Sequence, residues 1–142
     1  MARNSTQRVR DIMNEPICLE ADRPVTEAAT AMRDAGIGDV IVRDEDEVCG
    51  IVTDRDIVVR VVAEGRRPDE MKLADICSRD LTVVSPDDPV EDAIRKMREK
   101  ALRRLPVLEG GRPVGVVSLG DLAIERDPES ALGAISAASP NS

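Results

Sequence analysis

The chain contains no phenylalanine, tyrosine, tryptophan or histidine among its 142 residues. The absence of histidine excludes catalytic dyads and triads built on an imidazole base, and it removes the commonest transition-metal ligand. Without aromatic side chains there is no platform on which the bases of a nucleic acid stack. A core must therefore be aliphatic, and a chain of this length is long enough to form one without disulfides or metals.

Long apolar runs and paired cysteines are also scarce. No apolar run approaches the ~18 residues that span a bilayer, and the polar start MARNSTQRVRDIMNE shows no signal peptide. Cys18, Cys49 and Cys77 are odd in number and lack CxxC spacing, which favours a reducing compartment over a disulfide framework. We expect a cytoplasmic protein with no membrane partner, whose cysteines act as small hydrophobes rather than as metal ligands.

Acidic residues outnumber basic ones by 28 to 20, which gives a net charge of −8. This charge repels a phosphate backbone on average, so nucleic acid is not an expected partner. The sequence has no Gly-Lys pair to end a phosphate loop and no GxGxxG segment. The acidic run DEDE reads as a solvated hairpin turn. No catalytic constellation remains, and we predict that the protein is not an enzyme.

A tandem repeat organises the chain. Shifting the sequence by 65 positions aligns residues 24–57 with residues 89–122 without a gap, and nine aligned positions are identical. The segment DIM at residues 11–13 is echoed by DIC at residues 75–77. We divide the chain into a tail (1–8), a first repeat (9–65), a linker (66–72), a second repeat (73–126), and a short C-terminal helix with its tail (127–142).

Each repeat predicts the order strand, helix, strand, strand, helix. A short apolar stretch, PICLE or LTVVS, precedes a segment with apolar residues at helical spacing. Two strands joined by a polar turn follow, in DVIVR-DEDE-VCGIV and RLPVL-EGGR-PVGVV. A second helix then begins, and Gly65 ends it in the first repeat. The fold class is α/β (α+β), and each repeat has too little core to stand without its twin.

One motif, Gly-apolar-apolar-hydroxyl-x-x-Asp, stands at the same place in both repeats, as GIVTDRD and GVVSLGD. The spacing of Thr53 and Asp56, and of Ser118 and Asp121, is that of a capping box at a helix start. The same corner also suits a ligand. The glycine permits close approach to the backbone, the helix N-terminus favours phosphate, and the carboxylate accepts hydrogen bonds from a ribose diol. The two interpretations are compatible.

The order DIM (DIC in the second repeat), PV, LPV (VIV, without the proline, in the first repeat) and G-h-h-[TS]-x-x-D is present in both repeats. It resembles a tandem pair of cystathionine-β-synthase (CBS) domains, or Bateman module. The resemblance covers about residues 9–126. Within the family, the sequence is similar to the small stand-alone bacterial type that includes actinobacterial hypoxic response proteins. It implies two repeats packed about a pseudo-two-fold axis and a disc-like homodimer. It also implies clefts that commonly bind AMP, ADP, ATP or S-adenosylmethionine.

The resemblance assigns the ligand-binding roles. The family's ribose-binding acid falls on Asp56 and Asp121, and its neighbouring hydroxyl falls on Thr53 and Ser118. An aliphatic wall and backbone groups for adenine are implied at Ile17, Cys18, Leu81, Thr82, Val40, Val42, Leu105 and Pro106. An adenine nucleotide is expected as a regulatory ligand, and no metal or required cofactor is implied.

The two repeats differ where the family often places phosphate-binding cations. The second repeat has Arg103 and Arg104 before LPV, whereas the first has Gly38 and Asp39 there, with Arg55 as a compensating cation. An acid at Asp39 weakens anion binding if it faces the ligand. We predict one stronger nucleotide site that involves Arg103 or Arg104, although the carboxylate that accompanies them stays open. The alternative is that the arginines form a solvated helix end.

Two hypotheses for function follow. In the first, the protein is a non-catalytic sensor that binds an adenosine-containing ligand and acts on a separate, unidentified protein. In the second, it is a ligand-free scaffold for dimerisation or for interaction with another protein. A homodimer is expected in both, because valine- and alanine-rich helix faces such as IVVRVVA seek a partner.

Overall fold

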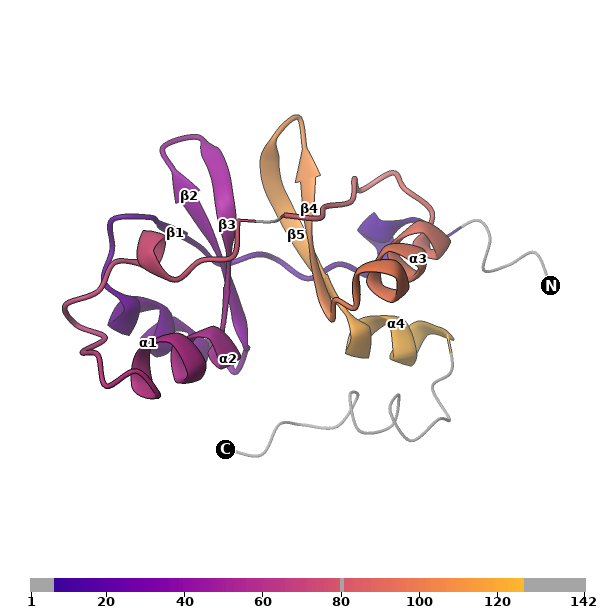
Figure 1. Cartoon of the computed structure of the whole chain (residues 1–142). Helices are drawn as coiled ribbons and strands as arrows, with labels where there is room; N and C mark the ends of the chain where they lie inside the picture. The colour runs from indigo at the N-terminus through magenta and orange to yellow at the C-terminus, as the bar shows by residue number, and fades with distance from the viewer. Residues whose placement is uncertain (1–6, 80, 127–142) are drawn as a thin grey trace. The chain divides into compact units, whose positions relative to one another are not determined.

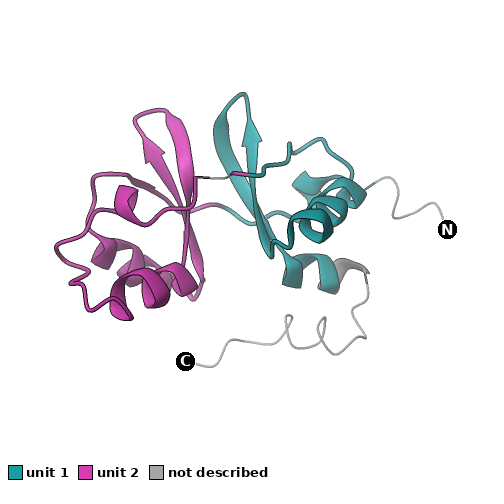
Figure 2. Ribbon diagram, viewed as in Figure 1, with its two compact units in different colours: residues 1–15, 82–142 teal, residues 16–81 magenta. Residues whose placement is uncertain are grey.

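The computed structural model describes residues 7–79 and 81–126, which form two compact units (Figure 2). Within this part of the chain, unit 1 comprises residues 7–15 and 82–126, and unit 2 comprises residues 16–79 and 81. The units therefore exchange the first residues of the two sequence repeats. The helix and tail expected at residues 127–142 lie outside the described residues.

Unit 2 contains β1 (Cys18–Glu20), α1 (Val25–Ala35), β2 (Asp39–Asp44), β3 (Glu47–Thr53) and α2 (Asp54–Ile57) (Figure 1). β1 pairs in parallel with β2, and β2 pairs antiparallel with β3. α1 ends at Gly36, whose φ of 66° is the left-handed conformation that glycine adopts without strain. This order confirms the predicted strand-helix-strand-strand-helix repeat.

Unit 1 contains α3 (Val90–Lys100), β4 (Arg104–Glu109), β5 (Arg112–Ser118) and α4 (Leu119–Arg126), with β4 and β5 antiparallel. The strand predicted at LTVVS is wrong, because only Val84 forms a bridge there, with Val107. Pairing stops after Val84 because a turn from Ser85 to Asp88 begins at once and Pro86 has no N–H to donate.

The cores are aliphatic, as the composition requires. In unit 2, one side of α1 packs on the β2–β3 hairpin, and in unit 1, α3 packs on β4 and β5 in the same way. Two short 3-10 turns, η2 (Val9–Asp11) and η4 (Leu73–Asp75), explain the exchange between repeats. The fully buried Val9 belongs to the core of unit 1, and the fully buried Leu73 belongs to that of unit 2. Burial of these side chains holds each segment in the unit of the other repeat.

The second helix of unit 2 changes its winding after one turn. α2 has four residues, and the segment Val58–Val62 (η3) continues as a π-helix. The backbone N–H of Ala63 donates to the carbonyl of Val58 at 2.8 Å. Val61 points into the core, whereas Val58, Val59 and Val62 are exposed. The helix predicted to run to Gly65 is therefore only partly α-helical.

Candidate functional site

The junction of β3 and α2, here called the Asp56 corner, is a complete capping box. The backbone N–H of Thr53 donates to Oδ2 of Asp56 at 2.9 Å, and the backbone N–H of Asp56 donates to Oγ1 of Thr53 at 3.2 Å. The other N–H groups of the first turn are also used. That of Asp54 donates to the carbonyl of Gly38 at 3.0 Å, and that of Arg55 donates to Oδ1 of Asp54 at 2.8 Å.

The junction of β5 and α4, the Asp121 corner, repeats this geometry. The backbone N–H of Ser118 donates to Oδ2 of Asp121 at 2.9 Å, and the backbone N–H of Asp121 donates to Oγ of Ser118 at 3.1 Å. Leu119 stands where the other corner has Asp54, so no carboxylate at this position accepts the N–H of Gly120. The capping-box interpretation is confirmed at both corners.

The glycine that opens each motif is needed by the chain itself. A Cβ on Gly50 would lie 2.3 Å from the carbonyl oxygen of Ser78, and one on Gly115 would lie 2.6 Å from Sδ of Met13. We predicted that these glycines admit a ligand to the backbone, but the space on the side-chain side of each glycine is filled by the chain itself. Each instead admits the segment exchanged from the other repeat.

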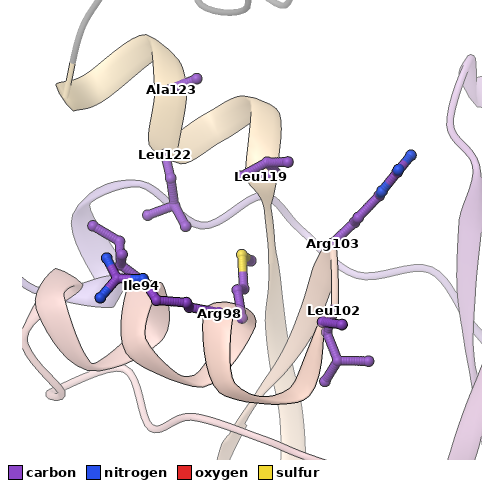
Figure 3. A pocket seen from close by; sticks show the side chains of 9 residues that line it. Ile94, Arg98, Leu102, Arg103, Leu119, Leu122 and Ala123 are labelled. Atoms are coloured by element: carbon purple, nitrogen blue, oxygen red, sulfur yellow. The ribbon is translucent and has the colours of Figure 1, made fainter.

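The two arginines of the second repeat lie at the Asp121 corner. The carbonyl of Arg103 accepts the backbone N–H of Leu119 at 2.8 Å, and Arg104 is the β4 residue opposite Ser118. The side chain of Arg103 extends away from α3 and α4 (Figure 3). Within unit 1, the backbone of these two arginines is therefore joined to the residues that begin the Asp121 corner.

The described side chains give the two corners opposite charge. Gly38 and Asp39 occupy the positions of the arginine pair at the Asp56 corner, where Asp39 lies opposite Thr53. Over the positions that the two motifs share, three carboxylates (Asp39, Asp54, Asp56) there accompany one guanidinium group (Arg55). At the Asp121 corner, one carboxylate accompanies the two arginines. The Asp121 corner is thus the more favourable one for an anion.

The residues implied for an apolar ligand wall divide into two groups. Four of them lie on β2 and β4 and are completely or nearly completely buried: Val40, Val42, Leu105 and Pro106. Partly buried residues are Ile17, Cys18, Leu81 and Thr82. Ile17 accepts the backbone N–H of Ile41 at 2.8 Å. Because the core takes up the side chains of Val40, Val42 and Leu105, these positions offer a ligand mainly backbone groups.

The cysteines are free thiols. Burial raises the pKa of the Cys18 thiol, against the lowering influence of Arg43, and burial with the nearby Cys77 raises the pKa of Cys49. Both thiols are therefore protonated at neutral pH and weakly nucleophilic. Across residues 7–79 and 81–126, no group of three or more metal-ligating side chains comes together.

Two residues that sequence reasoning did not identify contact the corner carboxylates. Nδ2 of Asn14 donates to Oδ2 of Asp121 at 2.9 Å. Nε of Arg60, in the π-helical segment, lies 3.8 Å from Oδ1 of Asp56. The spacing of four residues between Asp56 and Arg60 was a local signal for the second contact. The first had only an indirect signal, the echo of DIM by DIC, which places Asn14 and Ser78 at matching positions.

An apolar pocket of about 540 Å³ lies between α3 and α4 in unit 1. Leu122 points from α4 towards α3 across this space, and Ile94 and Leu102 come from the α3 side (Figure 3). Leu119, at its edge, is 40% exposed. The pocket has the apolar character of a surface that packs against another chain.

None of the helices in the described ranges combines the length and the apolar character needed to cross a membrane.

The family model for the CBS domain matches residues 9–63 and again residues 73–126. YlbB of Bacillus subtilis is 36% identical over 130 residues, which cover 89% of this chain and 86% of that protein. Hypoxic response protein 1 of Mycobacterium tuberculosis is 34% identical over 116 residues, covering 80% of this chain and 81% of that one. The MK0525 protein of Methanopyrus kandleri is 42% identical over 98 residues, and the matched region spans only 50% of its length.

Solved structures show the same fold. Hypoxic Response Protein I, crystallised with two coordinated zinc ions, has a TM-score of 0.72 and 30% identity, with 84% of this chain and 98% of that chain covered. The CBS domain pair of MJ0100, in complex with 5-methylthioadenosine and S-adenosyl-L-methionine, has a TM-score of 0.78 and 23% identity, with 88% and 99% covered.

Proposed function

Because the chain belongs to the CBS domain family and carries two CBS domains as a tandem regulatory module, we propose that it is a non-catalytic sensor of an adenosine-containing ligand. AMP, ADP, ATP and S-adenosylmethionine are the candidate ligands. The sensor acts on a separate protein. The free cysteines agree with a reducing compartment, and we place the protein in the cytoplasm.

The observation that carries this proposal is the hydrogen bonding of the two oxygens of the Asp121 carboxylate. Its hydrogen bonds with Ser118 and Asn14 both end on Oδ2. A carboxylate has about four lone-pair sites, so capping the helix leaves acceptor capacity for the two hydroxyls of a ribose. Arg103 and Arg104 supply positive charge for a phosphate or another anionic group. The ligands in the MJ0100 complex both contain an adenosine moiety, which supports the ligand class.

The ligand-free scaffold is the second candidate, and exposed apolar surface favours it. Val58 is 58% exposed and Val62 is 62% exposed on the π-helical segment. Both candidates include a homodimer, and we propose that these valines and the α3–α4 pocket contribute to its interface.

Val62→Glu is expected to weaken the dimer about tenfold, because it places a charge where apolar surface is buried between chains. Light scattering after size exclusion, over a dilution series, measures the change. Thr30→Glu is the matched control, because it adds the same charge at an exposed polar position of α1. Equal dimer strength in the two variants would remove the valines from the interface.

The proposed sensor is tested first by the ultraviolet spectrum of the desalted protein as purified. The chain has no tryptophan or tyrosine, so a retained adenine would dominate absorption near 260 nm. We expect an adenine absorption band, whose ligand is released from the protein after heat denaturation. If desalting has removed the ligand, adding AMP, ATP or S-adenosylmethionine should restore the band. If calorimetry at millimolar concentration detected no binding of any of the three ligands, the ligand-free scaffold would remain as the proposed function.

A further inference from the structure

Asn14 joins the N-terminal segment to the carboxylate of the Asp121 corner. Its backbone forms a two-bond bridge with β5, in which the N–H of Asn14 donates to the carbonyl of Val116 at 2.9 Å and the N–H of Val116 donates back at 3.0 Å. This bridge fixes the position from which Nδ2 of Asn14 reaches Oδ2 of Asp121 at 2.9 Å. The carboxylate therefore receives one donor from its own helix cap and a second from a distant part of the chain.

The other unit has the same backbone bridge without the side-chain contact. Ser78 pairs with Ile51, and the N–H of Ser78 donates to the carbonyl of Ile51 at 3.0 Å. A serine side chain is shorter than that of asparagine and has no amide donors. No bond between Ser78 and Asp56 is found among the described residues. The two corners therefore have the same backbone bridge at this position and differ in the side chain that the bridge carries.

A second difference concerns the opposite oxygen of the carboxylate. At the Asp56 corner, Nε of Arg60 lies 3.8 Å from Oδ1, and the Asp56 side chain is only 17% exposed. A diol must compete there with a guanidinium group. The two carboxylates therefore differ in their donors. Oδ2 of Asp121 accepts from the cap and from Asn14, whereas Asp56 has its cap bond on Oδ2 and Arg60 facing Oδ1.

We propose that Asn14 is a positioning residue that holds the Asp121 carboxylate ready for a ribose diol, and that it makes the Asp121 corner the tighter of the two. The proposal rests on the proposed sensor function and deepens it. The second torsion of an aspartate side chain is broad, so a free carboxylate loses freedom when it binds. Two donors on Oδ2 remove that freedom in advance, which lowers the cost of binding.

The test uses full-length chains that carry Asp56→Asn, so that only the Asp121 corner keeps its carboxylate. AMP and 2′,3′-dideoxy-AMP are the probes, and calorimetry measures their affinities. The substitution Asn14→Ser, which copies Ser78 of unit 2, is then added to this chain. It is expected to weaken AMP binding about fivefold, because a hydrogen bond to a charged group is lost in an exposed setting. The dideoxy analogue has no ribose hydroxyls to donate to the carboxylate, so its affinity should be the same with and without Asn14→Ser.

The matched control is Ser78→Ala at the equivalent position of unit 2, which should change neither affinity. Circular dichroism verifies that both variants are folded. Equal weakening of AMP and its dideoxy analogue by Asn14→Ser would show a merely structural effect and overturn the inference, as would unchanged AMP affinity. A parent chain that binds no AMP would overturn the assignment of Asp121 to a nucleotide ribose, and this inference with it. AMP binding that is indifferent to Asn14 would overturn the inference alone.

Discussion

Replacing Gly50 by alanine is expected to lower the free energy of unfolding by about 3 kcal/mol, because the new methyl group meets backbone rather than a movable side chain. The added Cβ would lie 2.3 Å from the carbonyl oxygen of Ser78 and 3.1 Å from Sγ of Cys77. Relief requires that Ser78 move away from β3. That movement breaks its paired hydrogen bonds with Ile51 and loosens the exchanged segment that carries the buried Leu73 and Ile76.

Urea unfolding followed by circular dichroism measures this effect, since the chain has no aromatic fluorophore. Gly65→Ala is the control for the intrinsic cost of losing a glycine. Its φ is +68° and a Cβ there meets nothing within 4 Å, so about 1 kcal/mol is expected. Gly115→Ala should fall between the two, because the obstructing group is the flexible side chain of Met13. A Gly50→Ala protein as stable as Gly65→Ala would show that Ser78 yields without cost.

Asp121→Asn is expected to weaken AMP binding about thirtyfold, because hydrogen bonds from the ribose hydroxyls would lose their charged acceptor. The amide keeps an oxygen of the same size for the N–H of Ser118, so the helix cap is largely preserved. Asp56→Asn should weaken binding much less, because the guanidinium of Arg60 already faces Oδ1 of that carboxylate. Calorimetric titration of both variants with AMP measures the difference.

The chain provides matched controls for this experiment. Asp11 accepts the backbone N–H of Arg8 at 2.9 Å, and Asp75 accepts that of Lys72 at 3.0 Å. Both carboxylates thus perform the capping function of Asp121 and Asp56 away from the two corners. Asp11→Asn and Asp75→Asn should therefore leave AMP affinity unchanged. If Asp121→Asn weakened binding no more than Asp11→Asn does, the carboxylate would have a capping role only.

Much of the fold follows from local pattern. The repeat predicted matching helices and hairpins, and the hydroxyl-x-x-Asp spacing predicted both capping boxes, because their hydrogen bonds join residues three apart. The strand at LTVVS was predicted wrongly, since an apolar run does not show whether a partner strand can continue past a proline. The π-helical winding of Val58–Val62 was also missed, because α- and π-helices share nearly the same apolar pattern over so few residues.

By itself, the sequence determined the repeat, the CBS family, the aliphatic core and the two motif carboxylates, because each is written in contiguous residues or in their periodicity. Only the tertiary structure decided that Ser78 and Met13 fill the space above Gly50 and Gly115, and that Asn14 reaches Asp121. Those contacts join residues 28 to 107 positions apart. Their existence depends on which repeat each exchanged segment packs with, and burial of side chains over the whole unit settles that choice.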